Sequence, residues 1–495
     1  MAYWLGIDIG TGGSRALLID GKGHIIGAVT APHDEMKMER PLWAEQDPDN
    51  WWVAAQQAIK GVLQLTGVSG AEIKGIGLSG QMHGLVLLDK DGKVIRPSLI
   101  WCDQRSQAQV DWINMKATPE AVLRCTANPV LTGFTLPKLL WVRDNEPANY
   151  ERGRMILLPK DYIRYKLTGD YATEVSDASG TALFDVVKRR WSTELASLVG
   201  VDKAMLPECL ESSQITGIIN AEAAAATGLK VRTPVIGGGG DQAASAVGNG
   251  IVKSGIVSCT IGTSGVVFGH MDQPAYDPAG RVHTFCHAVP DKWHVMGVTQ
   301  GAGLSLQWLR NQLMPGVEYD VLTTEASTAQ AGSMGLYWLP YLMGERTPHL
   351  DSTARAAWVG LTAKHTRAEM IRSVLEGVAF SQMDCLEIIE GLGTTVENVR
   401  LSGGGAKSAF WRQMFADVFN KQVVTLETQE GSAYGAALLA TVGTGEFGTV
   451  PEACDATISE VSTTLPVAET AKRYKQAHRT YQVIYPALKP IYKLL

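Results

Sequence analysis

One aspartate follows four consecutive glycines near the middle of the chain, in the stretch TPVIGGGGDQAASAVGNG at residues 233–250. Residues 234–236 predict a short buried strand, and the small residues after Asp241 predict a helix that begins there. A carboxylate at a helix N-terminus is stabilised by the free amides of the first turn, so a capping role fits Asp241. Each glycine costs about 0.5–1 kcal/mol relative to alanine, so four in a row favour close approach of another group to the main chain.

A second glycine-rich stretch, DIGTGGS, separates two apolar runs near the start of the chain. Its glycines, Gly10 and Gly12 among them, and the hydroxyl of Thr11 would let backbone amides surround a phosphate, and the Asp8 carboxylate suits a cation. A structural hairpin turn explains the same pattern equally well when it is taken alone.

The stretch GIVSCTIGTSGVVFGH at residues 255–270 repeats this order of strand, Gly-Thr turn and strand. Aligned on Gly-Thr, Asp8 corresponds to Thr260, so the second copy keeps the turn but lacks the carboxylate. Two such turns that face each other would hold both ends of one triphosphate, which neither turn predicts alone. The second phosphate turn consists of Gly262, Thr263 and Ser264. A further glycine turn after a strand, suited to backbone contact with a flat or anionic group, consists of Gly403, Gly404 and Gly405.

Polar residues also follow the strand predicted at residues 73–78, in the segment SGQMHG. Met82 and His83 lie between glycines, so His83 is open to two interpretations: a satisfied core histidine, or a hydrogen-bonding group in a polyol pocket. Lys138 is a single charge in the apolar run GFTLPKLLW, and it is expected to extend its amine to solvent.

The order of these elements favours an α/β protein with two domains. Three strands, a helix that Asp47 caps, and a fourth strand open the chain, and 495 residues exceed what one hydrophobic core usually supports. The expected hinge near the glycine run divides the chain into residues 1–245 and 246–495.

Composition excludes several classes of protein. A net charge of −6 and a pI near 6.0 argue against nucleic-acid and anionic-membrane partners. The seven cysteines have no CxxC spacing and predict neither disulfides nor a zinc site. No basic leader and no 18-residue apolar run occurs. Together these features lead us to expect a cytoplasmic location. The P-loop pattern GxxxxGK[ST] is absent, and the GxGxxG at residues 443–448 follows a helical run with no helix-forming run after it, which is the wrong context for dinucleotide binding.

With these motifs assembled, the chain resembles the FGGY carbohydrate kinases of the actin-like ATPase superfamily, most closely its xylulokinase members. The resemblance covers nearly the whole length and keeps the family's order of motifs: DIGTGG, GQMHG, GFTLPKLLW, GGGGDQAA, IGTSG, PYLMGERTPH and the run AAWVGLTAKHTRAEMIRSVLE. It implies two ribonuclease H-like domains with a catalytic cleft between them, the first for the sugar and the second for ATP.

By this resemblance, Asp241 is the catalytic base, Asp8 acts at the Mg2+-ATP phosphates, and Met82 and His83 contact the sugar beside Asp241 and Gln242. The implied reaction is ATP-dependent phosphorylation of D-xylulose to D-xylulose 5-phosphate. Gln242 stands where xylulokinases carry Asn and glycerol kinases carry Gln, so D-ribulose, L-xylulose and other polyols stay open as substrates. The oligomeric state is also open, and a homodimer is possible. A chaperone or filament ATPase of the same fold is the other class, and the GQMHG segment speaks against it.

Overall fold

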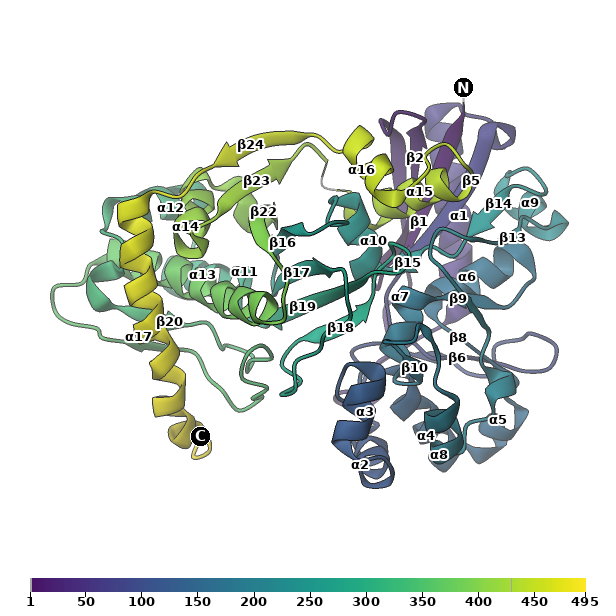
Figure 1. Cartoon of the computed structure of the whole chain (residues 1–495), viewed down its shortest axis with the longest axis horizontal. Helices are drawn as coiled ribbons and strands as arrows, with labels where there is room; N and C mark the ends of the chain where they lie inside the picture. Colours follow the sequence, from purple (N-terminus) through teal and green to yellow (C-terminus); the bar gives the residue numbers. More distant parts are fainter. Residues whose placement is uncertain (1, 429) are drawn as a thin grey trace.

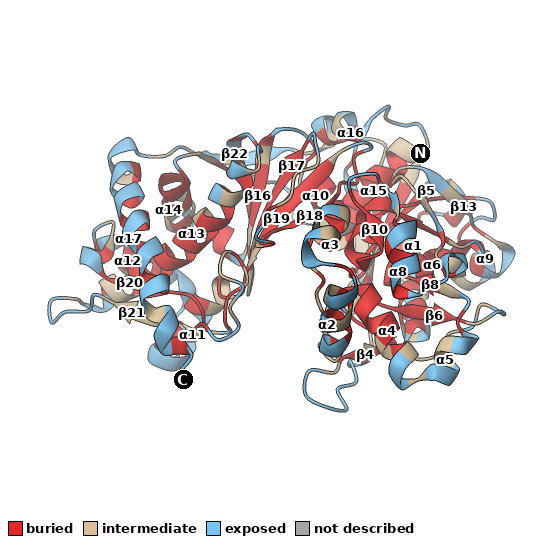
Figure 2. Ribbon diagram, turned by 60° about the horizontal axis from the view of Figure 1, so that its bottom comes forward, coloured by how far each residue is buried: buried red, intermediate tan, exposed pale blue. Residues whose placement is uncertain are grey.

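The computed structural model describes residues 2–428 and 430–495. The chain forms two lobes, and each lobe contains a seven-stranded mixed sheet covered by helices (Figure 1). This arrangement confirms the predicted two-domain α/β class. Figure 2 shows the central strands of both sheets as buried, whereas the edge strands at residues 25–32 and 460–464 are mostly exposed or half-buried.

The first sheet has the strand order β13-β14-β5-β1-β2-β3, with β15 beside β5. Its strands are β1 (Tyr3–Ile9), β2 (Gly13–Asp20), β3 (Ile25–Pro32), β5 (Ile73–Gly80), β13 (Ile215–Ile218), β14 (Pro234–Ile236) and β15 (Gly239–Gly240). The helices of this lobe include α1 (Pro48–Thr66), α6 (Pro159–Thr168), α9 (Ala221–Thr227) and α10 (Asp241–Gly248), and the cluster α2 (Gln107–Lys116), α3 (Pro119–Thr126), α4 (Thr135–Asn145), α5 (Pro147–Arg152) and α8 (Thr193–Val199). The predicted opening order of three strands, a helix capped by Asp47 and a strand is confirmed.

The second sheet has the order β18-β19-β17-β16-β22-β23-β24. Its strands are β16 (Gly255–Ile261), β17 (Gly265–Met271), β18 (His283–Cys286), β19 (Trp293–Thr299), β22 (Val396–Gly403), β23 (Gln422–Leu426) and β24 (Glu460–Thr464). The helices around it are α11 (Gly303–Leu313), α12 (Tyr319–Thr328), α13 (Arg367–Gly391), α14 (Ala409–Phe419) and α17 (Ala468–Tyr492).

The two sheets share one internal design around their central strands. β1 pairs with β2 in antiparallel and β5 in parallel orientation, and β16 pairs in the same way with β17 and β22. Asp8 lies opposite Ser79 on β5, and Thr260 lies opposite Ser402 on β22. The correspondence of Asp8 with Thr260, expected from the repeated Gly-Thr turns, therefore holds in three dimensions.

One helix of the second half, α15 (Gly431–Gly443), packs on the first sheet. In Figure 1 it lies over β1 and β5, on the side of the sheet opposite α1, and α16 (Val450–Thr457) packs beside it. Because side chains alternate along a strand, Leu5 and Ile7 join the core beneath α1, whereas Trp4, Gly6 and Asp8 face α15. The Trp4 indole donates a hydrogen bond to Thr444 Oγ1 at 2.7 Å, just beyond the end of that helix.

Glycines of the first sheet make this packing possible. A Cβ on Gly6 would lie 1.9 Å from the Ala433 carbonyl oxygen, and a Cβ on Gly77 would lie 1.9 Å from that of Ala436. α10 approaches α15 equally closely, since a Cβ on Gly435 would lie 1.8 Å from the Ala244 carbonyl oxygen. The backbones of sheet and helices are therefore in direct contact, which side chains larger than hydrogen would prevent.

The structure corrects one expectation about the GxGxxG segment. It follows α15, as predicted, but α16 begins shortly after it with Thr449 as N-cap, so a helix does follow the motif. No helix in the described part of the chain is long and apolar enough to cross a membrane.

The contact between Gly77 and α15 predicts a large loss of stability in Gly77→Ala. The added methyl must displace a backbone carbonyl, and overpacking of this kind typically costs about 1–3 kcal/mol. Chemical denaturation followed by tryptophan fluorescence would measure the loss. Gly391→Ala is the matched control, because no atom lies within 4 Å of its added Cβ. Equal stability of the two variants would contradict the tight seat of α15.

Candidate functional site

Asp8 ends the row of residues that faces α15. Its Oδ2 accepts a hydrogen bond of 2.8 Å from Ser432 Oγ, on the first turn of that helix. Its Oδ1 is buried and has no hydrogen-bond partner in the described structure. Burial raises the pKa of the carboxyl, and the hydrogen bond from Ser432 partly opposes the rise. A buried carboxylate oxygen without a partner is costly, so this atom is suited to a ligand such as a cation.

Asp241 is the first residue of α10, and the N-cap position belongs to Gly240. The capping interpretation of Asp241 is therefore wrong. Burial and the negative charge of Asp8 raise the pKa of Asp241 to about 7, against the hydrogen bonds from Gln242. The structure thus brings Asp8, Asp241 and Gln242 together, although they come from positions more than 230 residues apart. A carboxyl with a pKa near neutrality is matched to general-base catalysis.

The glycine run before Asp241 meets the main chain of β5. Gly238 has a φ of +79°, and a Cβ there would lie 1.9 Å from the Leu78 carbonyl oxygen. Gly239 and Gly240 form β15, and the Gly240 amide donates to Ser176 Oγ at 3.1 Å. The expected close approach is therefore real, and the group that approaches is a strand of the same sheet.

Met82 and His83 follow the end of β5 and lie near Asp241. A Cβ on Gly240 would lie 2.9 Å from Met82 Cγ, so Met82 packs directly against the residue before Asp241. His83 has a φ of +69°, and its Nδ1 lies 2.8 Å from the Gly180 carbonyl oxygen. Burial lowers the pKa of His83 to about 3, with a further contribution from Lys138, so the imidazole is neutral.

The tautomer of His83 follows from its partner. A carbonyl oxygen only accepts, so Nδ1 carries the proton and Nε2 is left as an acceptor. Nε2 has no partner among the described residues. The ring also stacks at 4.8 Å between centroids on Phe134, which fixes its orientation. His83 therefore offers one acceptor to a ligand hydroxyl.

Lys138 contradicts the expectation of a solvent-facing amine, because its side chain is completely buried. Its Nζ donates to the carbonyl oxygens of His83, at 2.9 Å, and of Gly133, at 2.5 Å. Burial lowers the pKa of Lys138 to about 7. The surrounding residues form α4, and most of them are buried on all sides of the helix. Their apolar side chains therefore enclose the amine, whereas the prediction had the lysine side chain crossing an apolar surface to reach solvent.

The first Gly-Thr turn connects β1 and β2 beside the end of β5. The Gly10 amide donates to the Gly13 carbonyl at 3.0 Å, and a Cβ on Gly12 would meet no atom within 4 Å. Thr11 Oγ1 lies 3.2 Å from Gln81 Oε1 and accepts from the Trp101 indole at 3.0 Å. The turn is thus tied to the GQMHG segment and has open space at its tip.

The second Gly-Thr turn lines a cavity of about 510 Å³ in the second lobe. Gly262 and Thr263 form one wall, and Gly404 and Gly405 of the turn after β22 form another. Ser264 and Gly403 lie next to these walls and are not part of the lining. The remaining lining includes Leu306, Tyr319 and Trp411, which suit a flat apolar group. The Gly-Thr turn and the glycine turn after β22 therefore lie side by side and line one cavity.

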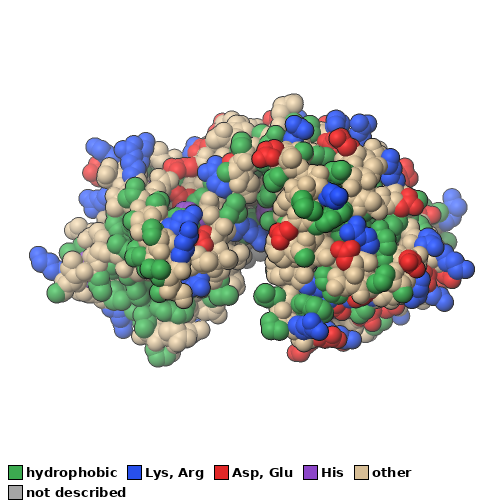
Figure 3. Space-filling view, turned by 90° about the horizontal axis from the view of Figure 1, so that it is seen from below, with side chains coloured by type: hydrophobic (Ala, Val, Ile, Leu, Met, Phe, Trp, Pro, Cys, Tyr) green, Lys and Arg blue, Asp and Glu red, His purple; other side chains and the backbone are tan. Residues whose placement is uncertain are grey.

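A cleft separates the two lobes, and Figure 3 shows the surface hollowed between them. Within the described residues no hydrogen bond or ion pair joins the turn at Gly10 to the turn at Gly262. The structure places them at equivalent ends of β1 and β16, and their action as one clamp stays a prediction.

The residues fit Mg2+ and a nucleoside triphosphate. The unpartnered Oδ1 of Asp8 is a hard oxygen ligand of the kind Mg2+ prefers, and its second oxygen is already held by Ser432. The cavity beside Gly262 has the size and lining of a nucleotide-base site, and the glycine turns leave backbone amides close to it.

Several residues of the site are not evident from the sequence. Ser432 lies 424 positions from Asp8, and only the small-residue run around it signals close helix packing. Lys160 is completely buried and lies within 3.5 Å of carboxylate oxygens of Asp161, Glu174 and Asp177, behind the segment that carries Ser176 and Gly180. No local pattern distinguishes these charges from surface residues.

Comparison with known proteins identifies relatives over the full length. The N-terminal domain of the FGGY family of carbohydrate kinases matches residues 3–248, and its C-terminal domain matches residues 257–444. A xylulose kinase of Bacillus subtilis (strain 168) is 38% identical over 491 residues, which cover 99% of this chain and 98% of that protein.

Solved structures agree with this relationship. A "xyloylose kinase" from Brucella ovis superimposes with a TM-score of 0.93 at 37% identity and covers 99% of this chain and 100% of its own. A gluconate kinase from Lactobacillus acidophilus superimposes with a TM-score of 0.92 at 28% identity and covers 98% of each chain. Kinases named for different sugars thus share this architecture.

The buried amine beneath His83 predicts a pH-dependent contribution to stability. The unfolded chain keeps the lysine proton up to a pKa of about 10.4, whereas folded Lys138 releases it above about pH 7. The unfolded state therefore binds more protons between these values. The free energy of unfolding of the parent, relative to Lys138→Met, should rise by about 1.4 kcal/mol per pH unit from pH 7.5 to 9.5.

Urea denaturation at a series of pH values would measure this difference. Lys60→Met, at an exposed position of α1, controls for the loss of a lysine as such. A difference between parent and Lys138→Met that stays constant over this range, or falls with pH, would contradict the inferred state of the amine.

Proposed function

Because this chain belongs to the FGGY family of carbohydrate kinases, we propose that it transfers the γ-phosphoryl group of ATP to D-xylulose. The products are D-xylulose 5-phosphate and ADP. The observation that supports this most directly is the pair of carboxyls at one point, Asp8 with a free buried oxygen and Asp241 with a pKa near 7. The xylulose kinase of Bacillus subtilis, similar over the full length, supports the choice of sugar.

Asp241 is assigned as the general base. The terminal hydroxyl of the sugar gives its proton to the Asp241 carboxylate as its oxygen attacks the γ-phosphorus, and the bond to the ADP oxygen breaks. The raised pKa keeps the carboxylate basic enough to accept this proton, and above about pH 7 it is mostly ionised. Little covalent chemistry is required, so positioning in the cleft supplies most of the remaining catalysis.

The other site residues orient the two substrates. His83 Nε2 accepts from a sugar hydroxyl, while Met82 and Gln242 border the same space beside Asp241. Asp8 holds Mg2+, which neutralises phosphate charge when bound. The turns at Gly10 and at Gly262 hold the triphosphate from opposite sides, and the cavity between Gly262 and Gly404 receives the adenine. We thus assign the sugar and base to residues 1–245 and the nucleotide to residues 246–495.

The choice of sugar needs its own experiment, because one fold carries kinases named for xylulose and for gluconate. Initial rates of ADP release with D-xylulose, D-ribulose, L-xylulose, gluconate and glycerol at equal concentration would rank the acceptors. D-Xylulose should give the highest kcat/KM. ADP release that no acceptor accelerates would instead support an ATPase without kinase activity.

Asp241→Asn tests the assigned base. The substitution keeps the shape of the side chain and removes the proton acceptor, so kcat should fall by about 10²- to 10⁴-fold while both substrates still bind. ADP release at saturating D-xylulose and Mg2+-ATP measures kcat. Asp455→Asn, an exposed carboxyl, is the control and should keep the parent rate. A kcat of Asp241→Asn within about threefold of the parent would refute the assignment.

Asp8→Asn tests the assigned metal ligand. The amide keeps the contact with Ser432 but loses the charge that attracts Mg2+, so the Mg2+ concentration for half-maximal rate should rise at least tenfold. The affinity for D-xylulose, measured by calorimetry without nucleotide, should change less than about threefold. An unchanged Mg2+ requirement combined with weaker sugar binding would show that Asp8 serves the sugar instead.

A further inference from the structure

Arg346 is an unpaired arginine in the loop after β20 (Tyr337–Leu339). Its backbone amide donates to Glu345 Oε1 at 2.8 Å, but its guanidinium has no ion pair or hydrogen bond with any residue that the structure describes. The residue is half-buried, and burial lowers the pKa of its side chain. A partly desolvated cation without a partner is costly, which points to a ligand that satisfies it.

Arg346 precedes Thr347, whose Oγ1 donates to the Arg281 carbonyl at 2.7 Å, two residues before His283 at the start of β18. The His283 ring lies 6.0 Å from Phe134, and the Phe134 ring lies 4.8 Å from His83. The charge of Arg346 accordingly lowers the pKa of both histidines. Arg346 therefore lies on the side of the cleft where His283, Phe134 and His83 come together.

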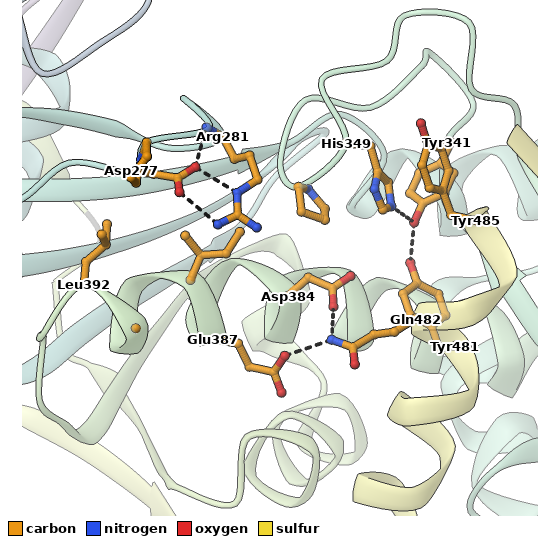
Figure 4. A pocket seen from close by; sticks show the side chains of 14 residues that line it. Asp277, Arg281, Tyr341, His349, Asp384, Glu387, Leu392, Tyr481, Gln482 and Tyr485 are labelled. Carbon is orange, nitrogen blue, oxygen red and sulfur yellow. Dashed lines mark hydrogen bonds and ion pairs between the residues drawn. The ribbon is translucent and has the colours of Figure 1, made fainter. Parts of the chain in front are cut away.

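The loop that carries Arg346 is held from behind. Thr347 Oγ1 donates to the Arg281 carbonyl at 2.7 Å, and the Thr347 amide donates to the Val298 carbonyl at 3.0 Å. On its far side the loop borders a pocket of about 660 Å³, in which the hydroxyl of Tyr341 lies 2.9 Å from His349 Nε2 (Figure 4). This anchoring fixes where the free guanidinium can reach.

The pocket in Figure 4 offers a contrast to Arg346. Arg281 pairs with Asp277, and the Gln482 amide donates to Asp384 and to Glu387. The arginine of this pocket thus has a carboxylate partner, which Arg346 lacks. Arg281 and Arg355 near the loop each make side-chain hydrogen bonds, whereas the guanidinium of Arg346 makes none within the described structure.

We propose that Arg346 binds the acceptor ketose, at the oxygen atoms farthest from the hydroxyl that is phosphorylated. This inference rests on the proposed ketose kinase function. A guanidinium only donates hydrogen bonds, and His83 Nε2 only accepts. The adjacent C1 hydroxyl and C2 carbonyl of a ketose match this pair, with the hydroxyl donating to His83 and the carbonyl accepting from the planar fork of Arg346.

Arg346→Gln tests this role against a role at the phosphates. Loss of a charged hydrogen bond to the sugar should weaken D-xylulose binding by about 10- to 100-fold, both as KM and in calorimetry without nucleotide. The KM for ATP should stay within about threefold. Arg346→Lys, which keeps the charge without the fork, should restore part of the affinity. Arg355→Gln, an exposed arginine of the same loop region bonded to nearby carbonyls, should match the parent.

Other outcomes would overturn the inference. An increase in the KM for ATP with unchanged ketose affinity would place Arg346 at the phosphates. Failure of both variants to fold, or a large loss of melting temperature with unchanged ketose affinity, would make the arginine structural. A parent enzyme that binds D-xylulose without phosphorylating it would refute the proposed function while leaving the binding test of Arg346 intact, and a parent that binds no ketose would refute both.

Discussion

Direct backbone contact between α15 and the first sheet is the constraint on which the site depends. Gly6 and Gly77 have no side chains at the two points of contact, so the carbonyls of Ala433 and Ala436 lie against the sheet itself. This contact sets the depth of the helix and brings Ser432, on its first turn, to 2.8 Å from Asp8. A helix lifted by the width of a methyl group would leave both oxygens of that carboxylate without a protein partner.

The same helix also positions α10, which begins at Asp241. Gly435 of α15 meets the Ala244 carbonyl, and Gly248 of α10 meets the Gly431 carbonyl, so the two helices cross with their backbones in contact. α15 thus positions both carboxyls of the site. By sequence it belongs to the half of the chain that carries the cavity beside Gly262. Small residues at such a crossing allow close packing without interlocked side chains.

Much of this arrangement could be predicted from the sequence because it is encoded locally. The glycine run before Asp241, the two Gly-Thr turns and the alternating strands of the first sheet each carry a short-range signal. The repeated turns also predicted that Asp8 and Thr260 occupy equivalent positions of the two sheets. What the sequence did not disclose depends on burial and on distant partners. Lys138 resembles a surface lysine until both faces of α4 are covered, and the capping role assigned to Asp241 belongs to Gly240.

In the proposed mechanism, the difference between the two lobes explains why two similar sheets give only one reactive centre. At equivalent positions, β1 carries Asp8 and β16 carries Thr260, whose hydroxyl lies 2.9 Å from Ser402 Oγ. The neutral pair can sit beside a polyanion without repulsion, which suits a turn that only holds phosphate. The charged residue of the first lobe needs a cation to coexist with the same polyanion, and its field raises the pKa of Asp241. In the proposed mechanism, one difference at a shared position thus separates a lobe that holds phosphate from a lobe in which a hydroxyl is deprotonated.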